Sequence, residues 1–262
     1  MNTERVSKHI VNWLKKYAEN AKVNGFVVGV SGGIDSAVTS TLCAKTGLKT
    51  VCVEMPIHQV ESQVSRALEH INSLKRTYKN VSSVKIDLTS TFEEFKIQVP
   101  FSENKPIVNL ALANTRARLR MTSLYYLAGL NGLLVAGTGN KVEDFGVGFY
   151  TKYGDGGVDL SPIADLLKSE VYELASYLNV SDSIQKAAPT DGLFGDSRTD
   201  EDQIGASYDE LEWAMKMLDD GKTISDFDGR KLEVFKIYKR LNSINQHKML
   251  PIPVCKINDE LK

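Results

Sequence analysis

A glycine-rich turn between a buried strand and a helix is the feature that most constrains the fold of this chain. Residues 26–30 form a continuous apolar run, and the turn Ser31-Gly32-Gly33-Ile34-Asp35-Ser36 follows directly. Two adjacent glycines let the backbone approach a ligand closely and adopt torsions that a side chain forbids. The amides of such a turn, together with the N-terminus of the following helix, suit an anion. The turn therefore predicts a phosphate-binding site at the end of a buried strand.

The spacing of this turn separates it from two common nucleotide-binding loops. It is neither the Gly-x-x-x-x-Gly-Lys-Ser/Thr of a Walker loop nor the Gly-x-Gly-x-x-Gly of dinucleotide folds. Ser31 and Ser36 add hydroxyl donors, whereas Asp35 would repel a bare phosphate at the same place. Asp35 therefore indicates an intervening Mg²⁺, which prefers oxygen ligands. The alternative is a glycine-rich turn with a Ser or Asp cap, which is common at strand–helix junctions.

Strands and helices alternate along the first two thirds of the chain. Apolar runs at residues 50–55, 81–88 and 133–136 predict three further strands, and the segments between them have helical periodicity. Continuous apolar strands separated by helices are typical of a parallel sheet that is covered on both faces. We expect an α/β, Rossmann-like fold with a doubly wound parallel sheet of five strands and helices on both faces.

The chain reads as a single domain over residues 1–262. The stretch 188–203 is polar, with Gly192 and Gly195 but little apolar periodicity, and a loop of this length in a compact domain is usually functional or disordered. We expect it to be a mobile loop that orders over the substrates. The helical segments at 208–218 and 232–242 are expected to pack against the sheet or a partner.

Composition limits the classes of partner and compartment. The formal net charge is −1, so nothing global directs the chain to nucleic acid or to an anionic membrane. The three cysteines are widely spaced, which favours reduced thiols and a cytoplasmic protein. The N-terminus is amphipathic and charged rather than a secretory signal, and the sequence shows no membrane-spanning run.

Later motifs connect the turn to a known family. The turn resembles the pyrophosphate loop of the ATP pyrophosphatases, whose fold is of the adenine nucleotide alpha hydrolase type. The segments 137–143 (GTGNKVE), 151–159 (TKYGDGGVD), 160–162 (LSP) and the pair His247-Lys248 follow in order. Together they resemble the ammonia-dependent NAD synthetases over nearly the whole chain. The Thr-Lys-Tyr-Gly-Asp-Gly-Gly stretch is the most specific of them.

The resemblance implies a ligase that forms a carbon–nitrogen bond in the last step of NAD biosynthesis. The nicotinate carboxylate of deamido-NAD attacks the α-phosphorus of ATP, and pyrophosphate leaves. Ammonia then attacks the acyl adenylate to give NAD and AMP. Such chemistry needs charge neutralisation and alignment rather than a protein nucleophile. Free ammonia is the expected donor, because a chain of this length has no room for the amidase domain of glutamine-using relatives; the alternative is ammonia delivered by a separate glutaminase.

The resemblance also implies site residues, and each is carried over by its place in a motif. The residues expected to bind ATP are Gly29, Val30, Ser31, Gly32, Gly33, Ile34, Asp35, Ser36, Met55, Thr138, Lys168 and Thr190. Those expected to bind deamido-NAD are Arg118, Lys152, Asp159, His247 and Lys248. Asp35 and Glu143 are expected to bind Mg²⁺, and Asp35, Lys168 and Thr190 to act in catalysis. The family forms homodimers, for which the first helix and the helix ending near Leu130 offer apolar surface.

Two departures from the family pattern and three rival functions stay open. After Pro56 the expected basic residue near ATP is missing, and His58 or Gln59 is the candidate replacement. The stretch 144–148 is about one residue longer than in some relatives. The rivals are a tRNA thiolase, a GMP synthetase and a nucleotide sensor without catalysis. The sequence does not separate deamido-NAD from nicotinate mononucleotide as the acceptor.

Overall fold

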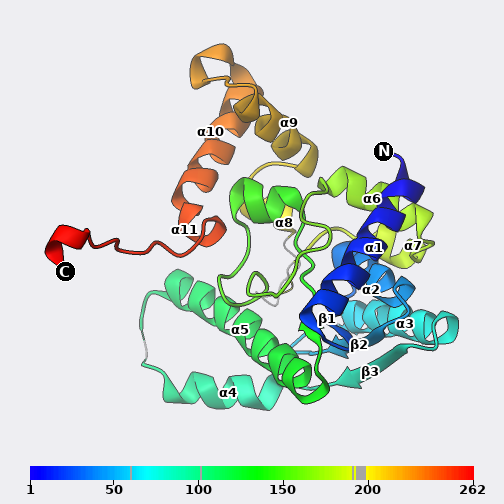
Figure 1. Ribbon diagram of the computed structural model, residues 1–262. Coiled ribbons are helices and arrows are strands. Elements are labelled where there is room, and N and C mark those ends of the chain that lie inside the picture. Colours follow the sequence, from blue (N-terminus) through cyan, green and yellow to red (C-terminus); the bar gives the residue numbers. More distant parts are fainter. Residues whose placement is uncertain (60, 101, 191, 193–198) are drawn as a thin grey trace.

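A parallel sheet forms the centre of the molecule (Figure 1). The computed structural model describes the chain except for residues 60, 101, 191 and 193–198. Within these limits the sheet has four strands in the order β3-β2-β1-β4, and all neighbouring pairs are parallel. Its strands are β1 (Gly25–Gly29), β2 (Lys49–Glu54), β3 (Val81–Lys85) and β4 (Leu134–Val135).

Helices cover both faces of the sheet. The larger helices are α1 (Thr3–Ala21), α2 (Ile34–Lys45), α3 (Glu61–Thr77), α4 (Thr89–Gln98), α5 (Lys105–Asn131), α6 (Lys168–Tyr177), α9 (Tyr208–Asp219) and α10 (Gly229–Ile244). The shorter ones are η1 (Val142–Val147), α7 (Asp182–Gln185), α8 (Asp200–Ile204), η2 (Ile224–Asp226), α11 (Gln246–Met249) and η3 (Asp259–Leu261). In the described part of the chain, no helix combines the length and apolar character needed to cross a membrane.

Successive side chains of β1 point to opposite faces of the sheet, and because all of them are apolar, the sheet must be covered by helices on both faces. Phe26 and Val28 are fully buried in the cluster formed with α1, α2 and α6. Val27 points the other way and is fully buried in the cluster formed with α4 and α5. Because successive side chains of a strand point to opposite faces, an all-apolar strand can be buried only between two helical layers. The prediction of an α/β fold with flanked parallel strands is confirmed.

The prediction of five strands is wrong. The chain returns to the sheet edge beside β4, but the contact is a single parallel bridge between Ala136 and Leu160. Two backbone hydrogen bonds accompany it, Gly137 N to Leu160 O and Asp159 N to Val135 O, at 2.8 and 3.1 Å. Pro162 follows almost at once and has no N–H group for a ladder, so the pairing does not extend.

The C-terminal helices also differ from the expectation. Instead of packing on the sheet, α9 and α10 pack on η1 and form an apolar cluster of their own with α8. Phe235, Leu211 and Val142 are among its fully buried members. After α11 the chain runs away from the other elements in extended form (Figure 1). This cluster holds η1 in place, which matters for the site described below.

The strand order places a crevice at the carboxyl end of β1. The chain leaves β1 toward β2 and β3 on one side, and β4 joins β1 on the other. Where the direction of winding reverses in this way, the loops after the two neighbouring strands separate and a ligand site opens between them. The turn 31–36 follows β1, and the segment 137–143 follows β4. The two segments that carry the motifs therefore face one another.

A buried histidine joins the two helices beneath the turn. His70 on α3 lies 2.9 Å from Ser40 Oγ on α2, through its Nε2 atom. Burial lowers the pKa of His70 from its ordinary value of 6.5 to about 4, although contacts with Ala37 and Glu69 oppose the shift. The folded state therefore binds fewer protons than the unfolded state at mildly acidic pH. His70 stabilises the fold fully above pH 6.5, and this contribution is lost as the pH falls toward 4.

We predict that His70→Gln flattens the acid side of the stability profile. In the wild-type protein, protonating His70 should cost about 3 kcal/mol of unfolding free energy between pH 6.5 and 4. Urea unfolding at several pH values measures this slope. His9→Gln, a change on the exposed face of α1, is the matched control and should keep the wild-type slope. A slope that survives in His70→Gln would show that other groups cause the acid instability.

Candidate active site

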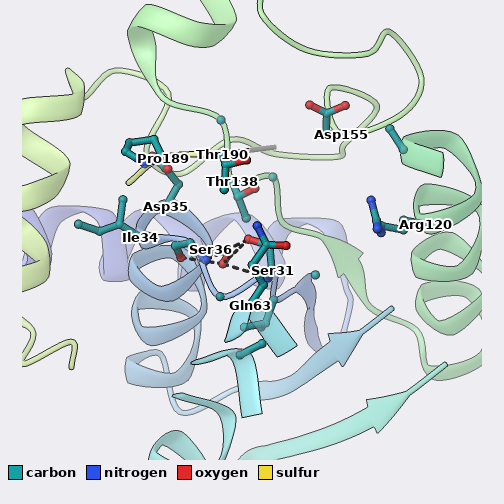
Figure 2. A pocket seen from close by; sticks show the side chains of 18 of the residues that line it. Ser31, Ile34, Asp35, Ser36, Gln63, Arg120, Thr138, Asp155, Pro189 and Thr190 are labelled. Atoms are coloured by element: carbon teal, nitrogen blue, oxygen red, sulfur yellow. Dashed lines mark hydrogen bonds between the residues drawn. The ribbon is translucent and has the colours of Figure 1, made fainter. Parts of the chain in front are cut away.

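Hydrogen bonds of its own serines fix the conformation of the turn after β1. Ser36 Oγ donates to the carbonyl of Gly33 at 2.9 Å, and the amide of Ser31 donates to Ser36 Oγ at 3.2 Å. Figure 2 shows this network at the floor of the cavity. Gly32 has φ +85, and a Cβ atom there would lie 2.5 Å from the carbonyl oxygen of Gln63. Glycine is therefore required at position 32 for both its torsion and its close contact with α3.

Helix α2 begins within the turn, at Ile34, and its first residues line the cavity. Its N-cap is Gly33 in an extended conformation, and no described side chain caps it. The first amides of a helix have no partner within the helix, so they are donors for an anion. The loop and the helix therefore present donors that suit a phosphate, while phosphate binding at the turn stays a prediction.

A buried lysine connects the turn to two other parts of the chain. Lys168, the first residue of α6, is 2% exposed. Its Nζ atom lies 2.6 Å from Asp35 Oδ2 on α2 and 3.0 Å from Glu143 Oε1 on η1. Asn140 donates to Asp35 Oδ1 at 3.1 Å, and Tyr208 OH donates to Glu143 Oε1 at 2.5 Å. Each carboxylate therefore has a neutral donor in addition to the shared cation.

Burial and the shared cation act in opposite directions on the two carboxylates. At Asp35, burial raises the pKa more than the charge of Lys168 lowers it. At Glu143, burial also raises the pKa, but Lys168 and the hydroxyl of Tyr208 outweigh it, so the pKa is lowered. Burial would lower the pKa of Lys168, yet the two carboxylates reverse this and raise it. The two carboxylates therefore favour the charged form of the lysine, and its charge balances part of the acidic cluster.

Glu143 lies within a π-helical turn. The segment η1 has one residue more per turn than an α-helix, and the amides of Gly148 and Phe149 both donate to the carbonyl of Glu143. Single-turn π-helices are common at functional sites. A π-helical turn accommodates more residues than an α-helical turn, so this geometry is compatible with the extra residue expected in the stretch 144–148.

The turn, Lys168 and Glu143 line one cavity of about 270 Å³. All residues that the sequence assigned to ATP and Mg²⁺ lie on its wall: Gly29, Val30, Ser31, Gly32, Gly33, Ile34, Asp35, Ser36, Met55, Thr138, Glu143, Lys168 and Thr190. In Figure 2, Thr190 and Pro189 lie on one side of the cavity and Arg120 on the other. The tertiary structure thus brings together residues from five separate segments, while their roles stay predictions.

The residues assigned to deamido-NAD lie outside this cavity, around a neighbouring hollow. Lys152 and Lys248 line that hollow, and Tyr150 and Val158 line both spaces. Arg118 Nε donates to the carbonyl of Lys152 at 3.2 Å. Lys152 in turn donates from Nζ to the carbonyl of His247. Four of the five residues are therefore connected or adjacent, beside the middle of α5.

Two of these side chains form hydrogen bonds with backbone groups of other segments. Lys248 Nζ donates to the carbonyls of Gly148 and Tyr150 at 2.7 and 2.8 Å. Asp159 accepts from the amide of Val135 at 2.8 Å and from Tyr125 OH at 3.0 Å. In this structure Lys248 and Asp159 therefore fix the segments that separate the two hollows.

Several residues of the cavity were not identified from the sequence. Gln63 and Arg66 come from α3, a segment without a motif, and their place in a shared site is visible only in three dimensions. Tyr208, which donates to Glu143, lies in another segment without a motif. Asn140, which donates to Asp35, had a signal, because it lies inside the 137–143 motif. Asp144 had none: it fills the space beside Gly139, where a Cβ atom would meet its oxygens at 2.1 Å.

Of the two residues considered as replacements for the basic residue expected after Pro56, one lines the cavity and the other does not. His58 turns away from the cavity and pairs with Glu93, at 2.7 Å. Gln59 lines the cavity and accepts from Arg120 Nη2 at 2.6 Å, while Arg120 Nε donates to the carbonyl of Met55 at 3.0 Å. A cation therefore reaches this end of the cavity from α5 rather than from the loop after β2.

The oxygen donors in the cavity suit a hard divalent cation. Asp35 and Glu143 offer two carboxylates to the space in front of the turn. No group of three or more His, Cys, Asp or Glu side chains that could hold a metal by itself occurs among the described residues. Mg²⁺ typically binds one or two carboxylates together with substrate phosphates, so the donor set fits a cation that arrives with a nucleotide.

Comparison with known proteins identifies the family. The model of the family described as NAD synthase matches residues 6–251. This chain belongs to the NAD synthase family. Among its curated relatives, the NH(3)-dependent NAD(+) synthetase of Methanosarcina mazei is 36% identical over 97% of this chain and 98% of its own. The protein of the same name from Archaeoglobus fulgidus is 36% identical over the full length of both chains.

Solved structures of two similar proteins share the fold. The NMN synthetase of Francisella tularensis is 32% identical and superposes with a TM-score of 0.83 over 99% of both chains. The NH3-dependent NAD synthetase of Campylobacter jejuni is 27% identical, with a TM-score of 0.77 over 98% of this chain and 100% of that one.

We predict that removing the buried cation destabilises the protein strongly. Lys168→Met leaves two buried carboxylates without their shared partner, which should cost about 3 kcal/mol or more at neutral pH. Chemical unfolding without ligands measures the loss. Lys141→Met, which breaks the exposed pair with Asp165, is the control and should cost less than about 1 kcal/mol. Similar losses in the two variants would contradict the proposed contribution of burial.

Proposed function

We propose that this protein catalyses the ATP-dependent amidation of deamido-NAD to NAD with ammonia. The observation that carries the proposal is one cavity that combines a phosphate-binding turn with the Lys168–Asp35–Glu143 cluster. The family and the names of the curated relatives support the reaction. The nicotinate carboxylate attacks the α-phosphorus of ATP, pyrophosphate leaves, and ammonia displaces AMP from the acyl adenylate. A rival thiolase, GMP synthetase or sensor has no comparable support.

ATP would lie along the cavity with its phosphates on the turn. The serines and the first amides of α2 would bind the phosphate oxygens. The backbone at Met55, at the end of β2, would meet the adenine ring, and Thr138 and Thr190 would contact the nucleotide from the two sides of the crevice. Lys168 would place its charge near the α-phosphate, where negative charge develops as pyrophosphate departs.

Asp35 and Glu143 would hold Mg²⁺ together with the phosphates. The bound ion would supply neutralisation of the phosphate charge. Both carboxylates share Lys168, so the lysine holds them in position before the nucleotide arrives. The side chains of this cluster therefore orient the reacting groups and need not form a covalent bond to them.

The acceptor would occupy the neighbouring hollow. Arg118, Lys152, Asp159, His247 and Lys248 surround it or hold the segments beside it. Because Tyr150 and Val158 line both hollows, a nicotinate ring placed at this boundary would bring its carboxylate toward the ATP phosphates. The single-domain organisation and the loop 188–203 as a lid are part of the proposal. Residues 191 and 193–198 of that loop, with the expected hinge Gly195, lie outside the described residues.

Nicotinate mononucleotide is the second candidate acceptor. The close structural likeness to the Francisella NMN synthetase favours it. Both acceptors carry the same nicotinate carboxylate, so the adenylation chemistry is the same for either. What would differ is the part of the acceptor that lies outside the ATP cavity, beyond Tyr150.

We predict that purified protein with ATP, Mg²⁺ and ammonium forms equal amounts of AMP and amidated product. Parallel reactions with deamido-NAD and with nicotinate mononucleotide, compared by kcat/KM, identify the acceptor. Asp35→Asn should lower kcat at least about a hundredfold, because it removes a charged ligand at the phosphates. Asp165→Asn, on the exposed surface, is the control. AMP without an amidated product from either acceptor would contradict the proposed function.

We further propose that the protein is a homodimer. Large apolar side chains are exposed on two helices: Tyr126 and Leu130 on α5, and Trp13 and Tyr17 on α1. An apolar surface of this kind is typical of an interface. Analytical ultracentrifugation should give twice the chain mass of 29.0 kDa.

The interface is tested by a charge on α5. Leu130→Glu should shift the protein toward the monomer, whereas Ile224→Glu, on the separate helical cluster, should not. A fully active wild-type monomer would contradict the dimer.

A further inference from the structure

The pyrophosphate end of the cavity needs a cation that the family motifs do not provide. Lys168 is committed to Asp35 and Glu143, at 2.6 and 3.0 Å. The same cavity is lined by further carboxylates, among them Asp144 and Asp155. ATP brings additional negative charge, and most of it lies on the two phosphates that leave together. Beyond Lys168, the cations on the described wall are Arg66 and Arg120.

Arg66 lies directly beside the phosphate-binding turn. Its Nε atom donates to the carbonyl of Gly32 at 3.4 Å. A Cβ atom built on Gly32 would lie 3.4 Å from Cβ of Arg66 and 3.1 Å from the amide nitrogen of Ala67. The backbone of α3 is thus packed against the tip of the turn, and the side chain of Arg66 leaves the helix beside Gly32.

The position of Arg66 is fixed by the core beneath it. Ala67, Ile71 and Leu74 on the same helix are buried in a cluster with Cys52 of β2 and Ala44 of α2. Arg66 itself is half-buried. Since α3 is anchored to both α2 and the sheet, the guanidinium is held at one end of the cavity rather than carried on a free loop.

The remaining donors of Arg66 suit a phosphate group. A guanidinium has five N–H donors in a rigid fork that matches two oxygens of a phosphate. The bond to Gly32 uses one of them, and Gly32 is the one hydrogen-bond partner of Arg66 among the described residues. Charged, forked pairs of this kind are about twice as strong as neutral hydrogen bonds.

Arg120, the other arginine on the wall, has different partners. It donates to the carbonyl of Met55 and to Gln59, at the end of β2 where the base is expected. Figure 2 shows Arg120 apart from Ser31 and Ser36 of the turn and on the far side of the cavity from Thr190. Arg66 therefore lies against the turn, where the phosphates are expected, and Arg120 lies where the base is expected.

We propose that Arg66 binds the β- and γ-phosphates of ATP and the pyrophosphate that leaves. The inference rests on the proposed function for the orientation of ATP, and it adds the residue that receives the leaving group. A cation held at this place stabilises the charge that builds up on pyrophosphate as the bond to the α-phosphorus breaks.

Equilibrium binding separates this role from a structural one. Calorimetric titrations of the full chain with ATP, AMP and pyrophosphate, each with Mg²⁺ and without acceptor, give three affinities per variant. Arg66→Met should weaken ATP and pyrophosphate binding about tenfold or more, the loss of a charged hydrogen-bonded pair, and change AMP binding less than about twofold. Arg66→Lys should recover part of the loss, because it restores the charge without the fork.

Arg120→Met is the matched control, since it removes the arginine of the same cavity that contacts the end of β2 rather than the turn. It should weaken ATP and AMP by similar factors and leave pyrophosphate unchanged. Equal losses for ATP and AMP in Arg66→Met, or no loss for pyrophosphate, would overturn the assignment. A wild-type protein that binds ATP and pyrophosphate in this pattern but forms no amidated product would sink the proposed reaction and leave the role of Arg66 intact.

Discussion

The ion pairs of Lys168 are the interaction on which the rest of the site depends. A cation that is 2% exposed is stable only if its charge is met at close range, and here Asp35 and Glu143 meet it from two different segments. The three residues come from the first turn of α2, the π-helical turn η1 and the first residue of α6. One buried charge thus joins the loop after β1, the segment after β4 and the helix beyond it.

The sheet topology explains why these segments meet at all. Reversal of winding beside β1 leaves a crevice between the loops after β1 and β4, and α3 closes one end of it through the contact of Gln63 and Arg66 with Gly32. The C-terminal cluster closes the other side, because Tyr208 of α9 donates to Glu143. A helical segment far from the motifs in sequence is therefore part of the support of the charged cluster.

The local features were predictable because their causes are local. The apolar run of β1 and the glycines at 32 and 33 have one good structural solution, and the motif after β4 indicated Thr138 and Glu143 before any contact was known. Other outcomes depended on distant packing. In place of the predicted fifth strand there is a single bridge between Ala136 and Leu160. His58 pairs with Glu93, whereas Gln59 lines the cavity and accepts from Arg120. No periodicity in the sequence carries that information.

By itself, the sequence determined the class of fold and the glycine-rich turn after β1, and it predicted a set of residues that line one cavity, since strand burial, glycine torsions and motif spacing are properties of short segments. The tertiary structure alone decided which cations line the cavity and what they contact. Arg66 and Arg120 lie on helices that carry no recognisable motif at these positions. Only their hydrogen bonds to the carbonyls of Gly32 and Met55 show that they belong to the cavity. It also decided that Lys248 and Asp159 hold backbone in place, because hydrogen-bond partners far along the chain are chosen by packing.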